Sequence, residues 1–218
     1  ANGAENIKQA VDEWNLWLPP REKNVSMHHV TYTMRDALYG ASVLMTFYKH
    51  GDTVGMSNLA QLVNVLPLIE TNKDTAIATS MFFPFVLFRQ MQHNVLTVHI
   101  EAETFNSREQ AINLKAHKNV NYIDGLASIS EDRSKLSLLL VNRYPFNRVS
   151  ADIYLDGVNE CTAVHAMQIV APSPEAYNSF DKPDRVRITD AQLPTFKKGS
   201  LHIHMKPCSV YYVDVNLK

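Results

Sequence analysis

The residues best suited to chemistry lie close to the start of the chain. Within residues 12–17 the sequence places two carboxylates, Asp12 and Glu13, beside Trp14 and Trp17, the only two tryptophans present. A carboxylate can attack or stabilise the oxocarbenium-like centre of a breaking glycosidic bond, and aromatic rings can pack against sugar rings. The motif therefore favours glycoside chemistry. An acidic surface turn beside core tryptophans is the alternative interpretation, which the motif alone leaves open.

The elements around this motif explain how it would be positioned. Residues 7–11 form a short strand candidate that ends at the motif, and catalytic side chains of (β/α) barrels sit at the carboxyl ends of strands. Residues 34–50 follow, with apolar side chains at spacings of three and four, which predicts an amphipathic helix. Gly51 directly after Lys49 and His50 is the expected C-terminal signal of that helix.

A second strand and a second helix are predicted next. Residues 54–66 read as a buried strand and its exit, and residues 75–92 as a helix that Pro84 kinks or interrupts. Gln61 and Asn64 are amides within an apolar run, and a buried amide is costly unless it is hydrogen-bonded. Either a substrate hydroxyl or neighbouring backbone could supply those bonds. The first half thus contains two consecutive βα units.

After residue 93 the apolar pattern changes to a period of two, which is typical of strands. Turn signals separate the strand candidates, and several short punctuated strands favour an antiparallel sandwich or jelly roll. We therefore predict two domains, 1–92 with βα units and 93–218 as a β-sandwich. The expected strands are 95–101, 136–142, 149–155, 162–170, 201–205 and 209–215, and the turns lie at 124–125, 156–157, 172–174 and 198–199.

Composition excludes several classes of protein. The chain has 21 Lys+Arg against 22 Asp+Glu and no long basic run, so we expect no nucleic-acid partner. No apolar stretch reaches the ~18 residues that span a membrane, so we expect no membrane partner. Cys161 and Cys208 are too few for a disulfide scaffold and form either one bridge or two buried thiols. The first residues lack the apolar core of a signal peptide, and both a cytoplasmic and a secreted location stay open.

Two histidine pairs invite a metal interpretation. His28 and His29 follow the predicted first strand, and His202 and His204 would share one face of a later strand. No nearby cysteine or acidic pair completes a tetrahedral ligand set at a recognisable spacing. We therefore expect neither a metal nor another cofactor.

The motif of residues 12–17 resembles the nucleophile motif of the α-L-arabinofuranosidases of glycoside hydrolase family 51. Further segments resemble that family in the family's own order. This resemblance implies a fold that joins α/β and all-β parts, with the last two βα units of a (β/α)8 TIM barrel followed by a jelly roll. The segments are 36–38, 46–47, 58–65 and 82–85 in the first half, and 124–126, 140–143 and 178–186 in the second.

The resemblance implies an activity and its residues. The enzyme would be a retaining, exo-acting α-L-arabinofuranosidase that releases arabinose from arabinan- or arabinoxylan-type chains without a metal or cofactor. Glu13 would be the nucleophile, Trp17 would form a wall of the sugar site, and Gln61 would hydrogen-bond the sugar. Asn64 is a further substrate-binding candidate. The resemblance also points to a homo-oligomer.

The sequence departs from the family in one respect that concerns the mechanism. The family's acid/base Glu lies in an Asn-Glu pair far upstream of the nucleophile, whereas only twelve residues precede Glu13 here. A retaining mechanism needs two carboxyl groups about 5–5.5 Å apart. We therefore expect the chain alone to be inactive, with the remainder of the barrel supplied by a missing N-terminal part or a second chain. The alternatives are a non-catalytic fragment whose jelly roll is a carbohydrate-binding or assembly module, and a related furanosidase or glucanase.

Overall fold

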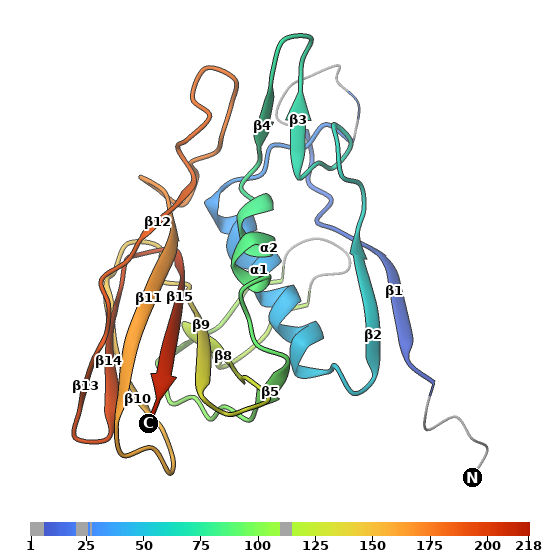
Figure 1. The fold of residues 1–218 in the computed structure, drawn as a ribbon. Coiled ribbons are helices and arrows are strands. Elements are labelled where there is room, and N and C mark those ends of the chain that lie inside the picture. Colours follow the sequence, from blue (N-terminus) through green and yellow to red (C-terminus); the bar gives the residue numbers. More distant parts are fainter. Residues whose placement is uncertain (1–6, 21–25, 27, 110–114) are drawn as a thin grey trace. The chain divides into compact units, whose positions relative to one another are not determined.

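The computed structural model describes residues 7–20, 26, 28–109 and 115–218, and they form two compact units (Figure 1). The first unit comprises Ala1–Met91 together with Ile169–Thr189, and the second comprises Gln92–Gln168 together with Asp190–Lys218. Ile169–Thr189 therefore belongs with the first unit, although the sequence analysis placed this segment in the second domain.

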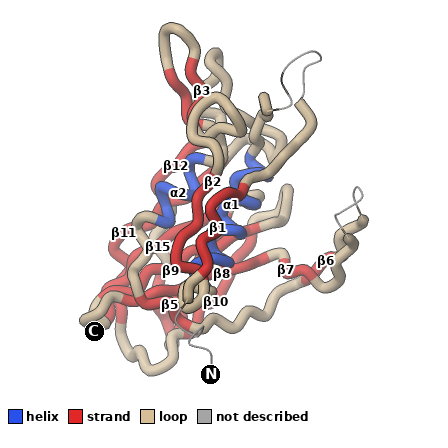
Figure 2. Tube along the Cα trace, turned by 90° about the vertical axis from the view of Figure 1, so that its right-hand side faces the viewer, coloured by secondary structure: helices blue, strands red, loops and turns tan. Residues whose placement is uncertain are grey.

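The first unit is built on a strand–helix–strand motif. Strand β1 (Gln9–Trp14) pairs in parallel with β2 (Val54–Leu59), and helix α1 (Met34–Lys49) connects them (Figure 2). A parallel pair requires such a crossover, because the chain must return to the same end of the sheet. The predicted helix is confirmed. It begins where Asp36 accepts hydrogen bonds from the amide and hydroxyl of Thr33, at 2.6 and 2.9 Å.

The predicted strand over residues 54–66 is wrong in its second half. Strand β2 ends at Leu59, and residues 60–66 form a loop. Asn64 and Leu66 have φ angles of 62° and 47°, which lie in the left-handed region and are incompatible with a strand. The dense apolar composition of the segment indicated a strand, but these two backbone angles turn the chain away from the sheet.

The predicted helix over residues 75–92 is also shorter than expected. A hairpin of β3 (Ile69–Thr71) and β4 (Ala76–Ala78) comes first, and helix α2 (Phe82–Phe88) follows. Pro84 lies in the first turn of α2, where no intrahelical N–H bond is lost, so it neither kinks nor interrupts the helix. Gly40 lets α1 approach this region, because a Cβ there would lie 3.1 Å from the sulfur of Met81.

Hydrogen bonds explain why Ile169–Thr189 belongs to the first unit. The first amides of α1 have no partner within the helix. The amide of Met34 donates to the carbonyl of Ala176 at 2.8 Å, and Arg35 donates to Pro174 at 3.2 Å. Asn178 also joins the two segments, because its buried amide group donates to the carbonyl of Ala78 at 3.0 Å.

The second unit is a β-sandwich. Its larger sheet has the strand order β12-β11-β15-β9-β8-β5, and its smaller sheet has the order β10-β14-β13. The bounds are β5 Asn94–Leu96, β8 Ile123–Ile129, β9 Lys135–Asn142, β10 Val149–Tyr154, β11 Cys161–Val170, β12 Arg187–Asp190, β13 Thr195–Lys197, β14 Ser200–Met205 and β15 Ser209–Leu217, with a separate pair β6 (Thr104–Phe105) and β7 (Val120–Asn121). One core cluster contains alternate residues of both sheets, among them Leu138, Val213 and Ile203.

Two local predictions for this unit are wrong. The strand expected over residues 95–101 ends at Leu96. Asp124-Gly125, read as a turn, lies inside β8, which pairs antiparallel with β9 along its whole length. Gly125 serves close packing there, because a Cβ would lie 2.9 Å from the Cδ2 of Leu140. The turn expected at 198–199 is confirmed, with φ angles of 50° and 83° that suit a tight hairpin.

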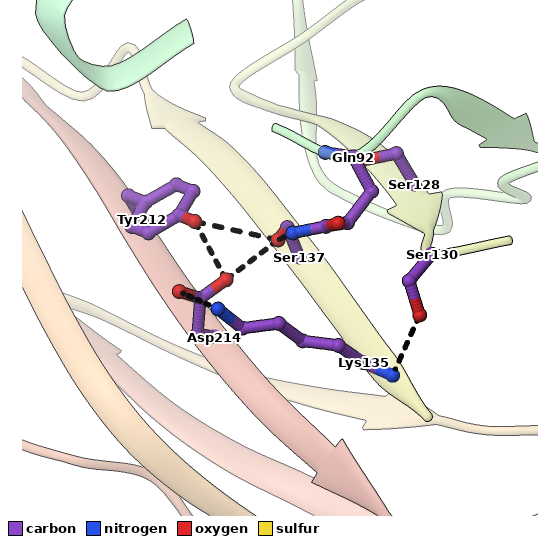
Figure 3. A network of polar contacts seen from close by, with 7 residues as sticks. All are labelled: Gln92, Ser128, Ser130, Lys135, Ser137, Tyr212 and Asp214. Atoms are coloured by element: carbon purple, nitrogen blue, oxygen red, sulfur yellow. Dashed lines mark hydrogen bonds and ion pairs between the residues drawn. The ribbon is translucent and has the colours of Figure 1, made fainter. Parts of the chain in front are cut away.

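The face of the larger sheet that points away from this core carries a buried polar network (Figure 3). The hydroxyls of Tyr212 and Ser137 each donate to Asp214 Oδ1 at 2.6 Å, and Lys135 Nζ lies 3.2 Å from Asp214 Oδ2. The Gln92 side chain donates to the Ser137 hydroxyl at 3.2 Å. Burial raises the pKa of Tyr212, so this phenol stays protonated and acts as a donor.

Replacing Asp214 with Ala tests the contribution of this network. The substitution removes the carboxylate that accepts from both the Tyr212 and the Ser137 hydroxyl in a buried site and leaves Lys135 without its ion pair to Asp214, so the free energy of unfolding should fall by about 3 kcal/mol. Asp156→Ala, in an exposed turn, is the matched control and should stay within about 0.5 kcal/mol of the parent chain. Urea unfolding followed by circular dichroism measures both values, and equal midpoints for the two variants would contradict the prediction.

Candidate active site

At the end of β1 an exposed carboxylate, Glu13, is followed directly by a buried tryptophan, Trp14. Trp14 is buried and lies against Phe47 of α1 and Phe85 of α2, with ring centroids 5.6 and 6.0 Å away. Glu13, the residue before Trp14 in the strand, is exposed. Packing of Trp14 thus fixes the strand end while leaving Glu13 accessible.

Asn15 holds the loop after β1 against the loop after β2. Its amide group donates to the carbonyls of Ala60 and Leu66 at 2.5 and 2.8 Å. Its oxygen accepts from the amide of Leu16 at 2.7 Å and from the hydroxyl of Tyr32 at 2.9 Å. Burial is the main cause of the raised pKa of Tyr32, which therefore remains a donor. Asn15 is a positioning residue, and no sequence pattern had indicated the contact that Tyr32 makes with it.

Gln61 and Asn64 lie in the loop after β2. Because β1 and β2 are parallel, with Trp14 opposite Leu59, this loop leaves the sheet at the same edge as Glu13. The peptide bond before Gln61 is cis, and both amides are exposed, not buried as their apolar surroundings suggested. Asn64 is engaged by the β3–β4 hairpin: its amide donates to the Thr71 hydroxyl at 2.8 Å and its oxygen accepts from the Thr71 amide at 2.7 Å.

Trp17 presents an aromatic surface in the same unit. Its side chain is 54% exposed, and its ring meets that of His28 edge-on with centroids 5.1 Å apart. His28 is oriented in turn by Ser26, whose hydroxyl lies 3.5 Å from Nδ1. An exposed indole braced by a second ring is suited to packing against the apolar face of a sugar.

The sequence analysis missed one titratable residue of this unit. Burial raises the pKa of the half-buried carboxyl of Glu70 on β3, and the charge of His29 partly opposes that shift. The alternation of Ile69, Glu70 and Thr71 is ordinary for a strand, so local sequence gave no functional signal there.

Among the residues that the structure describes, no group of three or more His, Cys, Asp or Glu side chains is placed to hold a metal ion. Cys161 and Cys208 are both buried and are not joined in a disulfide, which decides between the two alternatives left open by the sequence. Within the described ranges, no helix has the length and apolar character needed to cross a membrane.

Comparison with known proteins now assigns the family. Residues 12–209 match the family described as the α-L-arabinofuranosidase C-terminal domain, so the chain belongs to that family. Its solved relatives include enzymes of glycoside hydrolase family 51, and the chain corresponds to their C-terminal portion. The predicted relationship to the C-terminal portion of that family is thereby confirmed.

Three relatives show how far the similarity extends. The α-L-arabinofuranosidase of Thermotoga maritima, solved with arabinose, superposes with a TM-score of 0.85 at 30% identity and covers 97% of the chain. The intracellular exo-α-(1→5)-L-arabinofuranosidase of Streptomyces lividans is 24% identical and covers 94% of the chain. The probable α-L-arabinofuranosidase C of Aspergillus fumigatus is 31% identical over 122 residues, or 56% of the chain.

The chain spans only part of each relative. It covers 44% of the Thermotoga chain, 32% of the Streptomyces protein and 24% of the Aspergillus protein. Near the end of β1 the described residues place the exposed carboxylates of Asp12 and Glu13, and the same unit carries the exposed indole of Trp17 and the exposed amide of Gln61.

Replacing Asn15 with Asp tests whether this side chain locks the two loops together. A carboxylate cannot donate to the carbonyls of Ala60 and Leu66 and would place a charge beside them, so the first unit should lose about 2–3 kcal/mol of stability. Asn58→Asp, at an exposed position of β2, is the control and should change it by less than about 0.5 kcal/mol. Urea unfolding followed by tryptophan fluorescence reports on this unit, since Trp14 and Trp17 are the chain's only tryptophans. If Asn15→Asp and Asn58→Asp both unfold at the same urea concentration as the parent chain, Asn15 does not hold the two loops together.

Proposed function

We propose that this chain is the C-terminal part of a retaining, exo-acting α-L-arabinofuranosidase and that Glu13 is its nucleophile. The observation that carries the proposal is the exposed carboxylate of Glu13 at the carboxyl end of a parallel strand. That is where (β/α) barrels place catalytic side chains. Membership of the α-L-arabinofuranosidase C-terminal family supports the choice of sugar.

The remainder of a (β/α)8 barrel is the proposed partner of the first unit. In the part of the chain that the structure describes, β1 and β2 pair only with each other. Several apolar side chains of this unit are exposed, including Ile7 at 75%, Met56 at 50% and Leu62 at 57%. The indole N–H of Trp14 is buried without an acceptor among the described residues, which costs about 1–3 kcal/mol unless a partner supplies one. Further barrel strands would cover the edges and the apolar surface.

The mechanism follows from one carboxylate on this chain and one on the companion segment. Glu13 attacks the anomeric carbon of a terminal arabinofuranosyl group while an acid outside the described residues protonates the leaving oxygen. The resulting glycosyl–Glu13 ester is then hydrolysed by water, which that second group deprotonates, and the anomeric configuration is retained. Trp17 packs against the sugar, and Gln61 hydrogen-bonds one of its hydroxyls. Asn64 contributes less directly to sugar binding, because its side-chain amide is already hydrogen-bonded to Thr71.

Arabinan- and arabinoxylan-type chains are the proposed substrates. No described residue group supplies a metal site with three ligands, and the two-carboxylate mechanism requires no cofactor. A homo-oligomer is proposed as the working assembly on the strength of the family resemblance alone. The remaining alternative is a non-catalytic role in which the sandwich binds carbohydrate, and the exposed rings of Tyr154 and Phe146, at 74% and 76%, favour it.

The chain by itself should not hydrolyse an aryl α-L-arabinofuranoside. It supplies the nucleophile without the acid, and the loss of general-acid catalysis costs about 10²–10⁴-fold in rate even where the rest of a site is intact. Release of the aryl group by purified chain is compared with release by the same chain co-purified with its companion barrel segment. Turnover by the chain alone at the rate of the pair would refute the proposed division of the site.

Glu13→Gln in the paired protein should lower kcat by about 10⁴-fold or more, because the amide is isosteric but cannot form the ester. Asp12→Asn is the matched control, since Asp12 is the neighbouring exposed carboxylate of the same strand, and it should retain most of the turnover. Both rates are measured with the aryl substrate, and proton NMR of the first-formed sugar reports retention. An active Glu13→Gln enzyme would exclude Glu13 as the nucleophile. If the paired parent protein is inactive yet binds arabinan, the non-catalytic alternative holds.

A further inference from the structure

The smaller sheet of the second unit carries two histidines on its outer face. Along β14, Leu201, Ile203 and Met205 are buried in the core, and the alternation of the strand puts His202 and His204 on the opposite face. Their ring centroids are 4.6 Å apart. Two imidazoles are therefore held side by side on a strand whose other face is fixed by the core.

Each imidazole is oriented through Nδ1 by the neighbouring strand β10. Asp152 lies opposite His202 in the register, and Ser150 lies opposite His204. His202 Nδ1 is 2.8 Å from the Asp152 carboxylate, and His204 Nδ1 is 2.8 Å from the Ser150 hydroxyl. Among the described residues neither Nε2 atom has a hydrogen-bond partner, so both remain available to a ligand.

A divalent late transition metal ion matches this arrangement. Neutral imidazole nitrogen is a preferred ligand of Cu²⁺, Ni²⁺ and Zn²⁺, and Cu²⁺ forms the strongest complexes of the series. Metal-bound histidines usually donate their second ring N–H to a carboxylate or another oxygen, which fixes the tautomer and the ring orientation. Asp152 and Ser150 are placed to accept in this way.

We propose that His202 and His204 form a two-imidazole site for a late transition metal ion, with Cu²⁺ bound most tightly. Asp152 is a positioning residue that holds the ring of His202. No third His, Cys, Asp or Glu of the described chain joins the cluster, so water completes the coordination sphere. The His202 side chain is 41% exposed, which leaves room for bound water. This proposal is independent of the catalytic role assigned to Glu13.

Calorimetry and electron paramagnetic resonance of the full chain, made without a polyhistidine tag and probed with CuCl₂, test the site. The parent chain should bind one Cu²⁺ with two coordinated nitrogens. His202→Ala and His204→Ala should each lower the affinity at least about tenfold, and Asp152→Asn should lower it about tenfold through the lost orientation of His202. Circular dichroism checks that each variant is folded.

His99→Ala is the matched control. His99 lies 3.6 Å from Glu101, so it also pairs an exposed imidazole with a carboxylate, and among the described residues its ring meets no second imidazole. The control should leave the affinity and the spectrum unchanged. The proposal is overturned if the His202 and His204 variants bind Cu²⁺ as the parent does, or if the parent spectrum shows no pair of nitrogen ligands.

Discussion

The parallel pairing of β1 with β2 is the constraint on which the candidate site depends. Parallel strands end at the same edge, so the register that sets Trp14 opposite Leu59 brings the end of β1, which carries Glu13, and the loop after β2, which carries Gln61, to the same edge of the sheet. Helix α1 makes this pairing possible as the crossover. Asn15, in the loop after β1, then joins the two loops by donating to the carbonyls of Ala60 and Leu66 in the loop after β2. Without the pairing of β1 with β2, the carboxylate of Glu13 and the amide of Gln61 would be separated even though neither residue had changed.

The alternation of side chains along strands separates anchors from accessible groups in both units. In β1 the buried ring of Trp14 fixes the strand, and the adjacent Glu13 is left exposed. In β14 the buried Ile203 does the same for His202 and His204. A buried apolar neighbour therefore fixes the strand segment that carries each accessible group.

Sequence patterns predicted those elements whose formation depends on interactions between residues close together in the chain. The apolar spacing of α1 could be read from sequence because it repeats over several residues. The strand expected over residues 7–11 is shifted, because β1 runs from Gln9 to Trp14 and includes Glu13. The exit of β2 could not be read from sequence, since the positive φ angles at Asn64 and Leu66 leave no mark in an apolar composition. Asp124-Gly125 was wrongly predicted to be a turn, because glycine occurs both in turns and inside strands where side chains pack closely against the backbone. The membership of Ile169–Thr189 in the first unit depends on long-range bonds such as Met34 to Ala176, which no local pattern encodes.

The central claim is that Glu13 forms a covalent bond to the sugar, and trapping that intermediate tests the claim most directly. The paired protein is incubated with a slow 2-fluoro arabinofuranosyl substrate, quenched in acid, digested and sequenced by mass spectrometry. The account predicts one added glycosyl group on the peptide that contains residues 12–17, located on Glu13 and absent from the Glu13→Gln variant. A glycosyl group on any other residue, or turnover with no trapped intermediate, would contradict it.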